Sequence, residues 1–76
     1  MDKISKVMAA VEAELRSATA KFGPFNSTHE GYAVILEELD EMWDEIKANN
    51  VELSVREAVQ VAAMGCRYIV DNTNDD

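Results

Sequence analysis

Two glutamates, Glu38 and Glu41, lie three positions apart in an acidic segment of the chain. Residues three apart lie on the same side of a helix, so their carboxylates can share one cation. A third glutamate, Glu57, and an amide, Gln60, follow in the next segment that we expect to be helical. Proteins typically hold Mg²⁺ with one or two carboxylates and substrate phosphates. A helical hairpin that brings these four side chains together is therefore a pattern for holding Mg²⁺ and phosphate.

A purely structural explanation covers the same residues. Acidic amphipathic helices are common, and one of them would place Glu38 and Glu41 on a solvated face. Glu57 also fits the last position of a capping box that begins at Ser54. In that position its side chain would accept a hydrogen bond from the backbone N–H of the N-cap. On spacing alone, this explanation is the more common of the two.

The apolar residues from Ile4 to Phe22 recur in steps of three and four, which predicts a first helix. A Gly-Pro pair at 23–24 ends it, and the two phenylalanines beside that pair, Phe22 and Phe25, are expected to pin the turn to the core. A second helix is predicted from a capping box at 27–30 to about residue 48. Its apolar face contains the following residues: Tyr32, Ile35, Leu36, Leu39, Met42, Trp43 and Ile46. Glu38, Glu41 and Glu45 lie along one margin of that face.

The third predicted helix begins at Ser54 and ends near Asp71. It is apolar on two sides, and the second side consists of Val61, Met64 and Tyr68. Because the chain has only two other helices, we expect this second side to meet another subunit. The prediction is an all-α fold of three helices, a first helix followed by a helical hairpin, in a single domain at 4–71, with a polar tail at 72–76 that we expect to be frayed.

A chain of 76 residues buries only about 60% of the surface that its unfolded form exposes. It has no disulfide to compensate, since Cys66 is its only cysteine, and we expect that thiol to be a small core residue. With 47% hydrophobic residues, association with further copies would add buried surface. We therefore expect a homodimer or homotetramer, assembled through the second and third helices.

The formal net charge of -8 argues against partners that are themselves anionic. Such a surface repels nucleic acid and anionic lipid unless basic residues are segregated, and no basic patch is visible in the sequence. The N-terminus lacks the apolar run of a secretory signal, and no stretch approaches the roughly 18 apolar residues of a membrane span. We expect a cytoplasmic protein that binds neither nucleic acid nor membranes.

The order Leu36-x-Glu-Glu-x-x-Glu41, followed by Glu57 and then 61–64 (Val-Ala-Ala-Met), resembles the MazG-like, all-α NTP pyrophosphohydrolase superfamily. The turn at 21–25 (Lys-Phe-Gly-Pro-Phe) is similar to the entry segment of short MazG-like proteins of phages and bacteria. The resemblance spans roughly residues 15–71. It implies a hydrolase that uses Mg²⁺, or Mn²⁺, to convert a (d)NTP into a monophosphate and pyrophosphate, in the cytoplasm of the host if a phage encodes it.

The resemblance also implies roles for individual residues. Glu38, Glu41 and Glu57 match the metal-binding and catalytic positions, and Glu37 matches the glutamate that precedes the pair, as a further ligand or as a neighbour of the ligands. Gln60 stands where the family more often has aspartate. Its neutral amide is a weaker ligand and cannot act as a base, so the resemblance leaves catalytic activity open.

The candidates for contacts to the rest of a nucleotide are basic and aromatic residues: Lys21, Arg56 and Arg67 for phosphate, and Trp43 or Tyr68 for base stacking. For each, a structural role is the stronger alternative, with the basic residues solvated and Trp43 in the core. Three functions remain open at this point. They are a Mg²⁺-dependent pyrophosphohydrolase, a related module that binds a nucleotide without hydrolysing it, and a helical interaction protein.

Overall fold

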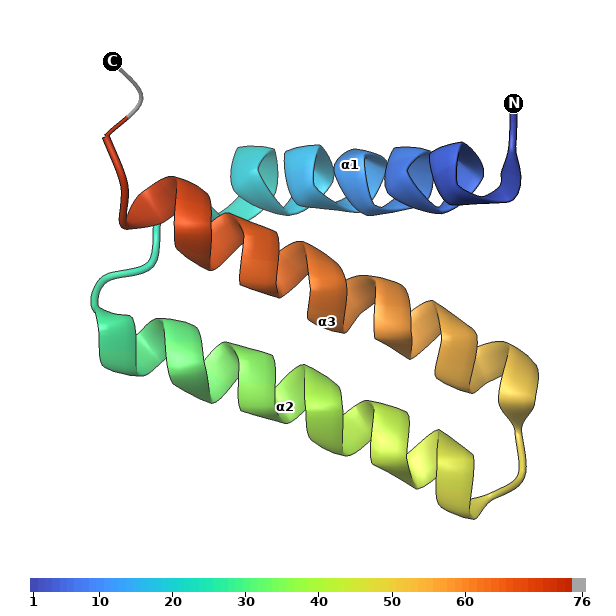
Figure 1. The fold of residues 1–76 in the computed structure, drawn as a ribbon. Coiled ribbons are helices and arrows are strands. Elements are labelled where there is room, and N and C mark those ends of the chain that lie inside the picture. Colours follow the sequence, from blue (N-terminus) through green and yellow to red (C-terminus); the bar gives the residue numbers. More distant parts are fainter. Residues whose placement is uncertain (75–76) are drawn as a thin grey trace.

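The computed structural model describes residues 1–74 and consists of three helices. They are α1 (Lys3–Phe22), α2 (Thr28–Lys47) and α3 (Val51–Asp71). In Figure 1, α2 and α3 form an antiparallel hairpin, and α1 packs on the other side of α3 from α2. The all-α fold is confirmed, and residues 75 and 76 of the tail that we expected to be frayed lie outside the described part of the chain.

The first two helices begin and end as their sequence signals predict. At the start of α2 the Ser27 hydroxyl accepts a hydrogen bond from the Glu30 amide (3.1 Å). The backbone N–H of Asn26 donates to the Glu30 carboxylate (3.0 Å). The backbone N–H groups of Glu30 and Asn26 are therefore both satisfied at this helix start. At the end of α1, Gly23 has φ +70°, a left-handed conformation that glycine adopts without steric cost.

The third helix begins one turn earlier than predicted. Its N-cap is Asn50, whose side chain accepts a hydrogen bond from the Leu53 amide (3.3 Å). Ser54 lies inside the helix and donates its hydroxyl to the Val51 carbonyl (2.7 Å). The prediction of a capping box at Ser54 was wrong because asparagine is an equally good N-cap, and Asn50 stands before a segment that continues the helix. Glu57 is consequently a mid-helix residue that does not cap the start of α3.

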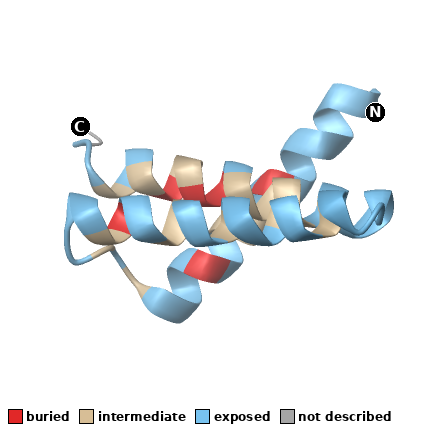
Figure 2. Cartoon of the chain, turned by 90° about the horizontal axis from the view of Figure 1, so that it is seen from below, coloured by how far each residue is buried: buried red, intermediate tan, exposed pale blue. Residues whose placement is uncertain are grey.

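The core is small and lies along α3. Its buried apolar residues are Val11 and Ala18 from α1 and Ala63 and Met64 from α3. Figure 2 shows the buried positions (red) as a few short segments of a chain that is mostly exposed or half-buried. Half-buried residues complete it, among them Cys66, as expected of a structural thiol. Met64 is buried within the single chain, and the ring of Tyr68 packs on Gly31 of α2. The second side of α3 therefore meets α2 of the same chain, and the expectation that another subunit covers it was wrong.

The turn between α1 and α2 is anchored by only one of its two phenylalanines. Phe25 is half-buried, whereas Phe22 is 67% exposed and does not pin the turn to the core as predicted. Phe22 is the last residue of α1 and lies at the wall of a groove, where the Arg67 guanidinium is 5.8 Å from the centre of its ring. Within residues 1–74, none of the helices combines the length and the apolar character needed to cross a membrane.

Candidate metal and phosphate site

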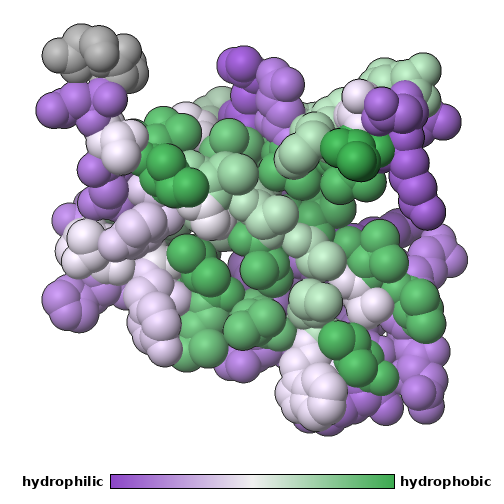
Figure 3. Space-filling model, viewed as in Figure 1, coloured by the Kyte–Doolittle hydropathy of each residue, from purple (hydrophilic) through white to green (hydrophobic). Residues whose placement is uncertain are grey.

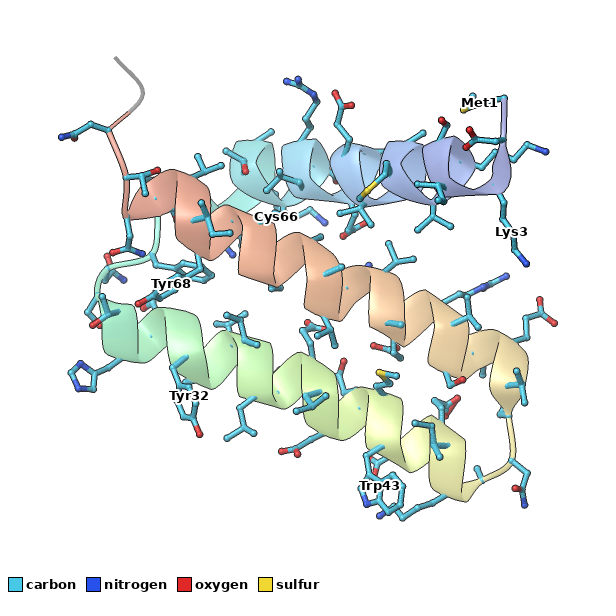
Figure 4. The ribbon with its side chains drawn as sticks, in the orientation of Figure 1. Met1, Lys3, Tyr32, Trp43, Cys66 and Tyr68 are labelled. Carbon is cyan, nitrogen blue, oxygen red and sulfur yellow. The ribbon has the colours of Figure 1, made fainter. Side chains whose placement is uncertain are left out.

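Helix α2 faces α3 with its acidic margin, not with the centre of its apolar face. The residues of α2 that are buried or half-buried along its length include Gly31, Ile35, Glu38, Met42 and Glu45. They recur in steps of three and four, which defines the side that faces α3. Trp43 lies on a different side and is 54% exposed, so the expectation of a core tryptophan was wrong. Figure 4 shows Trp43 and Tyr32 pointing away from α3.

This orientation brings three of the predicted glutamates together. Glu38 and Glu41 from α2 and Glu57 from α3 each offer a carboxylate oxygen, and the three oxygens lie within 4.8 Å of one another. Ligand oxygens around an octahedral Mg²⁺ at about 2.1 Å lie roughly 3 to 4 Å apart. Small side-chain rotations would therefore suffice for the three oxygens to share one divalent cation.

The proximity of these carboxylates changes their acidity. Burial raises the pKa of Glu38 to about 7, helped by the negative charge of Glu41 and a hydrogen bond with it, and then by the charges of Glu57 and Glu37. Burial also raises the pKa of Glu57, followed by the charge of Glu41. Glu38 therefore keeps part of its proton near neutral pH, and a bound cation would displace that proton.

The polar atoms of this cluster fit a cation. Glu57 Oε2 and Glu45 Oε2 are buried and have no hydrogen-bond partner. Among the ion pairs within residues 1–74, none involves Glu38, Glu41, Glu45 or Glu57. A buried carboxylate oxygen without a partner is costly, and a divalent cation held with Glu38 and Glu41 would satisfy that of Glu57.

A groove of about 310 Å³ adjoins the cluster, with residues of all three helices and of the turn after α1 along its walls. Glu37, Glu38, Gln60 and Arg67 all line it, so four of the predicted site residues share one cavity. Glu38 belongs to both the groove and the carboxylate cluster. A ligand in the groove would therefore contact the cation site at Glu38.

Arg67 provides a positive charge in this groove. It is only 5% exposed, its guanidinium lies 3.9 Å from the centre of the Phe25 ring, and its Nη2 donates to the Gly23 carbonyl (2.7 Å). No carboxylate of residues 1–74 forms an ion pair with it, and its Nε is buried without a hydrogen-bond partner. Guanidinium is the side-chain group best suited to phosphate oxygens, so an anionic ligand would provide the missing counter-charge.

The other predicted contact residues lie outside this groove. Lys21 is exposed above the Phe22 ring, and Arg56 is exposed and 3.7 Å from Glu52. Tyr68 packs on Gly31, and Trp43 lies on the outer side of α2 beneath Lys47. The structure therefore places Arg67 near the carboxylates and leaves the other four candidates apart from the groove.

Two acidic residues near the site were not singled out as ligands from the sequence. Glu45 contributes to the raised pKa of Glu57, and Glu14 of α1 lines the groove. The sequence could have placed Glu45 near the site, since it lies seven positions after Glu38 and therefore on the same side of the helix. The sequence could not have placed Glu14, because only the packing of α1 on α3 brings it to the groove. Comparisons with protein-family models, curated proteins and solved structures each found no match to this chain.

Proposed function

We propose that this protein is a Mg²⁺-dependent nucleoside triphosphate pyrophosphohydrolase that converts (d)NTPs into a monophosphate and pyrophosphate. The observation that carries the proposal is the cluster of Glu38, Glu41 and Glu57, which joins a groove that also contains Arg67. A cation site and an unpaired guanidinium in one cavity suit a ligand with several phosphate groups. The resemblance of 36–41 and 57–64 to MazG-like proteins supports the same substrate class.

In this proposal each residue has a distinct task. Glu38, Glu41 and Glu57 hold the divalent cation, with Glu37 and Gln60 beside them on the groove wall. A bound Mg²⁺ or Mn²⁺ neutralises phosphate charge and lowers the pKa of the attacking water. Arg67 orients a phosphate at its own position in the groove. The reaction consumes one water, breaks the bond between the α- and β-phosphates, and releases pyrophosphate.

Gln60 favours a second candidate function, a module that binds a nucleotide without hydrolysing it. The side chain lines the groove, but an amide cannot accept a proton from water. Hydrolysis would then depend on the cation held by Glu38, Glu41 and Glu57 to activate the water.

A panel of (d)NTPs incubated with Mg²⁺ or Mn²⁺, and analysed by chromatography, tests the proposal. We expect a monophosphate and pyrophosphate from at least one nucleotide, and loss of both products in Glu41→Gln. The matched control is Asp40→Asn, which removes one charge from the neighbouring exposed position of the same helix and should preserve activity. Tight binding of a nucleotide with no product would favour the binding module, and neither binding nor hydrolysis would favour an interaction protein.

A further inference from the structure

A second groove lies between α1 and α3, at the end of the molecule where both helices begin. It measures about 380 Å³ and shares no residue with the groove beside the carboxylates. We call it the N-terminal groove. Its walls consist of seven apolar residues and two lysines: Val7, Ala10, Val11, Val55, Ala58, Val59, Ala62, Lys3 and Lys6.

The packing of α1 on α3 creates this groove. The two helices run in the same direction, and the start of α1 diverges from the hairpin in Figures 1 and 2. Val11 is buried, whereas Val7 and Val55 nearer the helix starts are 51% and 58% exposed. The alanines at 10, 58 and 62 are too short to fill the space between the helices. The groove is therefore apolar surface that the single chain leaves uncovered.

The two lysines lie at one end of the groove. From Lys3 to Val11 the wall formed by α1 is about 12 Å long, and both lysines fall within its first 5 Å or so. Figure 4 shows the Lys3 side chain extending from α1 towards α3. Figure 3 shows apolar (green) side chains between these helices and hydrophilic (purple) ones at the end where α1 begins. The groove is thus charged at one end and apolar along the rest.

The charge at this end is positive and without a partner. Neither lysine forms an ion pair with a carboxylate of residues 1–74. The carboxylate of Asp2 caps α1 by accepting a hydrogen bond from the Ser5 amide (2.7 Å), and Arg56 is offset by Glu52 at 3.7 Å. The amino ends of α1 and α3 add partial positive charge. This end of the groove is therefore suited to an anion, although the chain as a whole has a net charge of -8.

We propose that the N-terminal groove binds a single-chain aliphatic carboxylate, a free medium-chain fatty acid. The alkyl chain lies along the valines and alanines, and the carboxylate meets the ammonium groups of Lys3 and Lys6. The volume lies within the range of about 300 to 1,000 Å³ found for small-molecule sites, which are mostly apolar with a few polar groups that fix orientation. A groove with charge at one end only fits a ligand that has one charged head and an apolar tail.

Titration of the full chain with octanoate, followed by ¹⁵N–¹H spectra and by thermal unfolding, tests this site. We expect the amide signals of the groove residues to shift and the melting temperature to rise. Decanoate should bind more tightly than octanoate, by about two- to fourfold for each added methylene. The uncharged 1-octanol should bind about fivefold more weakly than octanoate, because it forms no ion pair.

Two variants separate the charged end from the apolar walls. Lys3→Gln combined with Lys6→Gln should weaken octanoate binding about fivefold and leave 1-octanol binding unchanged. Ala62→Phe fills the groove and should weaken the binding of both ligands. Ala33→Phe is the matched control, because it adds the same ring at an exposed position of α2 outside the groove. Ala62 is exposed as well, so its replacement leaves the buried core unchanged.

Several results would overturn the proposal. One is the absence of any shift in the groove signals at millimolar octanoate, and another is full octanoate affinity in Ala62→Phe or in the double lysine variant. Binding of the chain to phosphatidylglycerol vesicles through the two lysines, without competition by octanoate, would assign the groove to a lipid surface. Sedimentation that shows a second copy covering the groove, with octanoate excluded, would assign it to self-association.

Discussion

The ring of Tyr68 on α3 packs directly on Gly31 of α2. A Cβ placed on Gly31 would lie 2.6 Å from Tyr68 Cδ2 and 3.3 Å from Phe25 Cδ2. Gly31→Ala should therefore force the tyrosine ring to move and should lower the free energy of unfolding by about 1 to 3 kcal/mol in urea titrations. Gly65→Ala is the control, because no atom of residues 1–74 outside the adjoining backbone of α3 lies within 4 Å of its added Cβ. A loss in Gly31→Ala no larger than that in Gly65→Ala would contradict the packing.

Stability without metal should fall as pH rises towards neutrality. Glu38 in the folded chain keeps its proton up to about pH 7, whereas its ordinary pKa is 4.5. Between these two values the native state binds more protons than the unfolded state, so the free energy of unfolding decreases with rising pH. We expect a lower melting temperature at pH 8 than at pH 5 in the presence of a chelator. Glu38→Gln should flatten this dependence, and an equally steep profile in that variant would assign the effect to other groups.

Divalent cations should reverse this loss of stability. A cation tenfold above its dissociation constant stabilises the native state by about 1.4 kcal/mol. For a domain of this size, each kcal/mol raises the melting temperature by roughly 4 to 8 °C. The rise with Mg²⁺ or Mn²⁺ should vanish when Glu38→Gln and Glu41→Gln are combined, and should persist in Asp40→Asn. Persistence of the rise in the double variant would mean that the cation binds elsewhere.

Gln60 separates the two candidate functions. Gln60→Asp adds a carboxylate to the groove beside Glu38, so it should tighten Mg²⁺ binding in calorimetric titrations. If the protein is a hydrolase, the same substitution should raise the amount of monophosphate formed from a (d)NTP. If it is a binding module, hydrolysis should stay undetectable and nucleotide binding should weaken. Unchanged Mg²⁺ affinity in Gln60→Asp would show that position 60 does not contact the cation.

The guanidinium of Arg67 should bind phosphate anions. The chain has three arginines, and the other two, Arg16 and Arg56, are exposed. Their replacement by lysine leaves a single arginine Nε–H signal in a ¹⁵N–¹H spectrum. Because this Nε is buried, its proton should exchange slowly enough to be seen near neutral pH. Titration with inorganic pyrophosphate should shift the signal both with Mg²⁺ and with a chelator, whereas chloride at equal ionic strength should not. No shift under either condition would remove Arg67 from the phosphate site, independently of whether the carboxylates bind a cation.

The sequence by itself was enough to predict three helices and most of their ends. The apolar periodicity, the capping box at Ser27 and the glycine at 23 act through contacts within a few residues, so local sequence is sufficient. The juxtaposition of Glu38, Glu41 and Glu57 also followed from spacing on a hairpin, and the structure brings them together. Local signals failed at Ser54, where Asn50 offered a competing N-cap one turn earlier.

Only the tertiary structure decided which side of each helix is covered. Periodicity shows that α2 has an apolar side, but the rotation of α2 about its axis depends on its packing against α3, which includes the contact of Tyr68 with Gly31. In the packed hairpin the acidic margin is turned inward, Trp43 is exposed, and Arg67 lies in the groove with Glu38. The stable arrangement is the one whose packing contacts are best over the whole interface between α2 and α3. These contacts join residues far apart in the sequence, so the spacing or type of any one residue does not predict them.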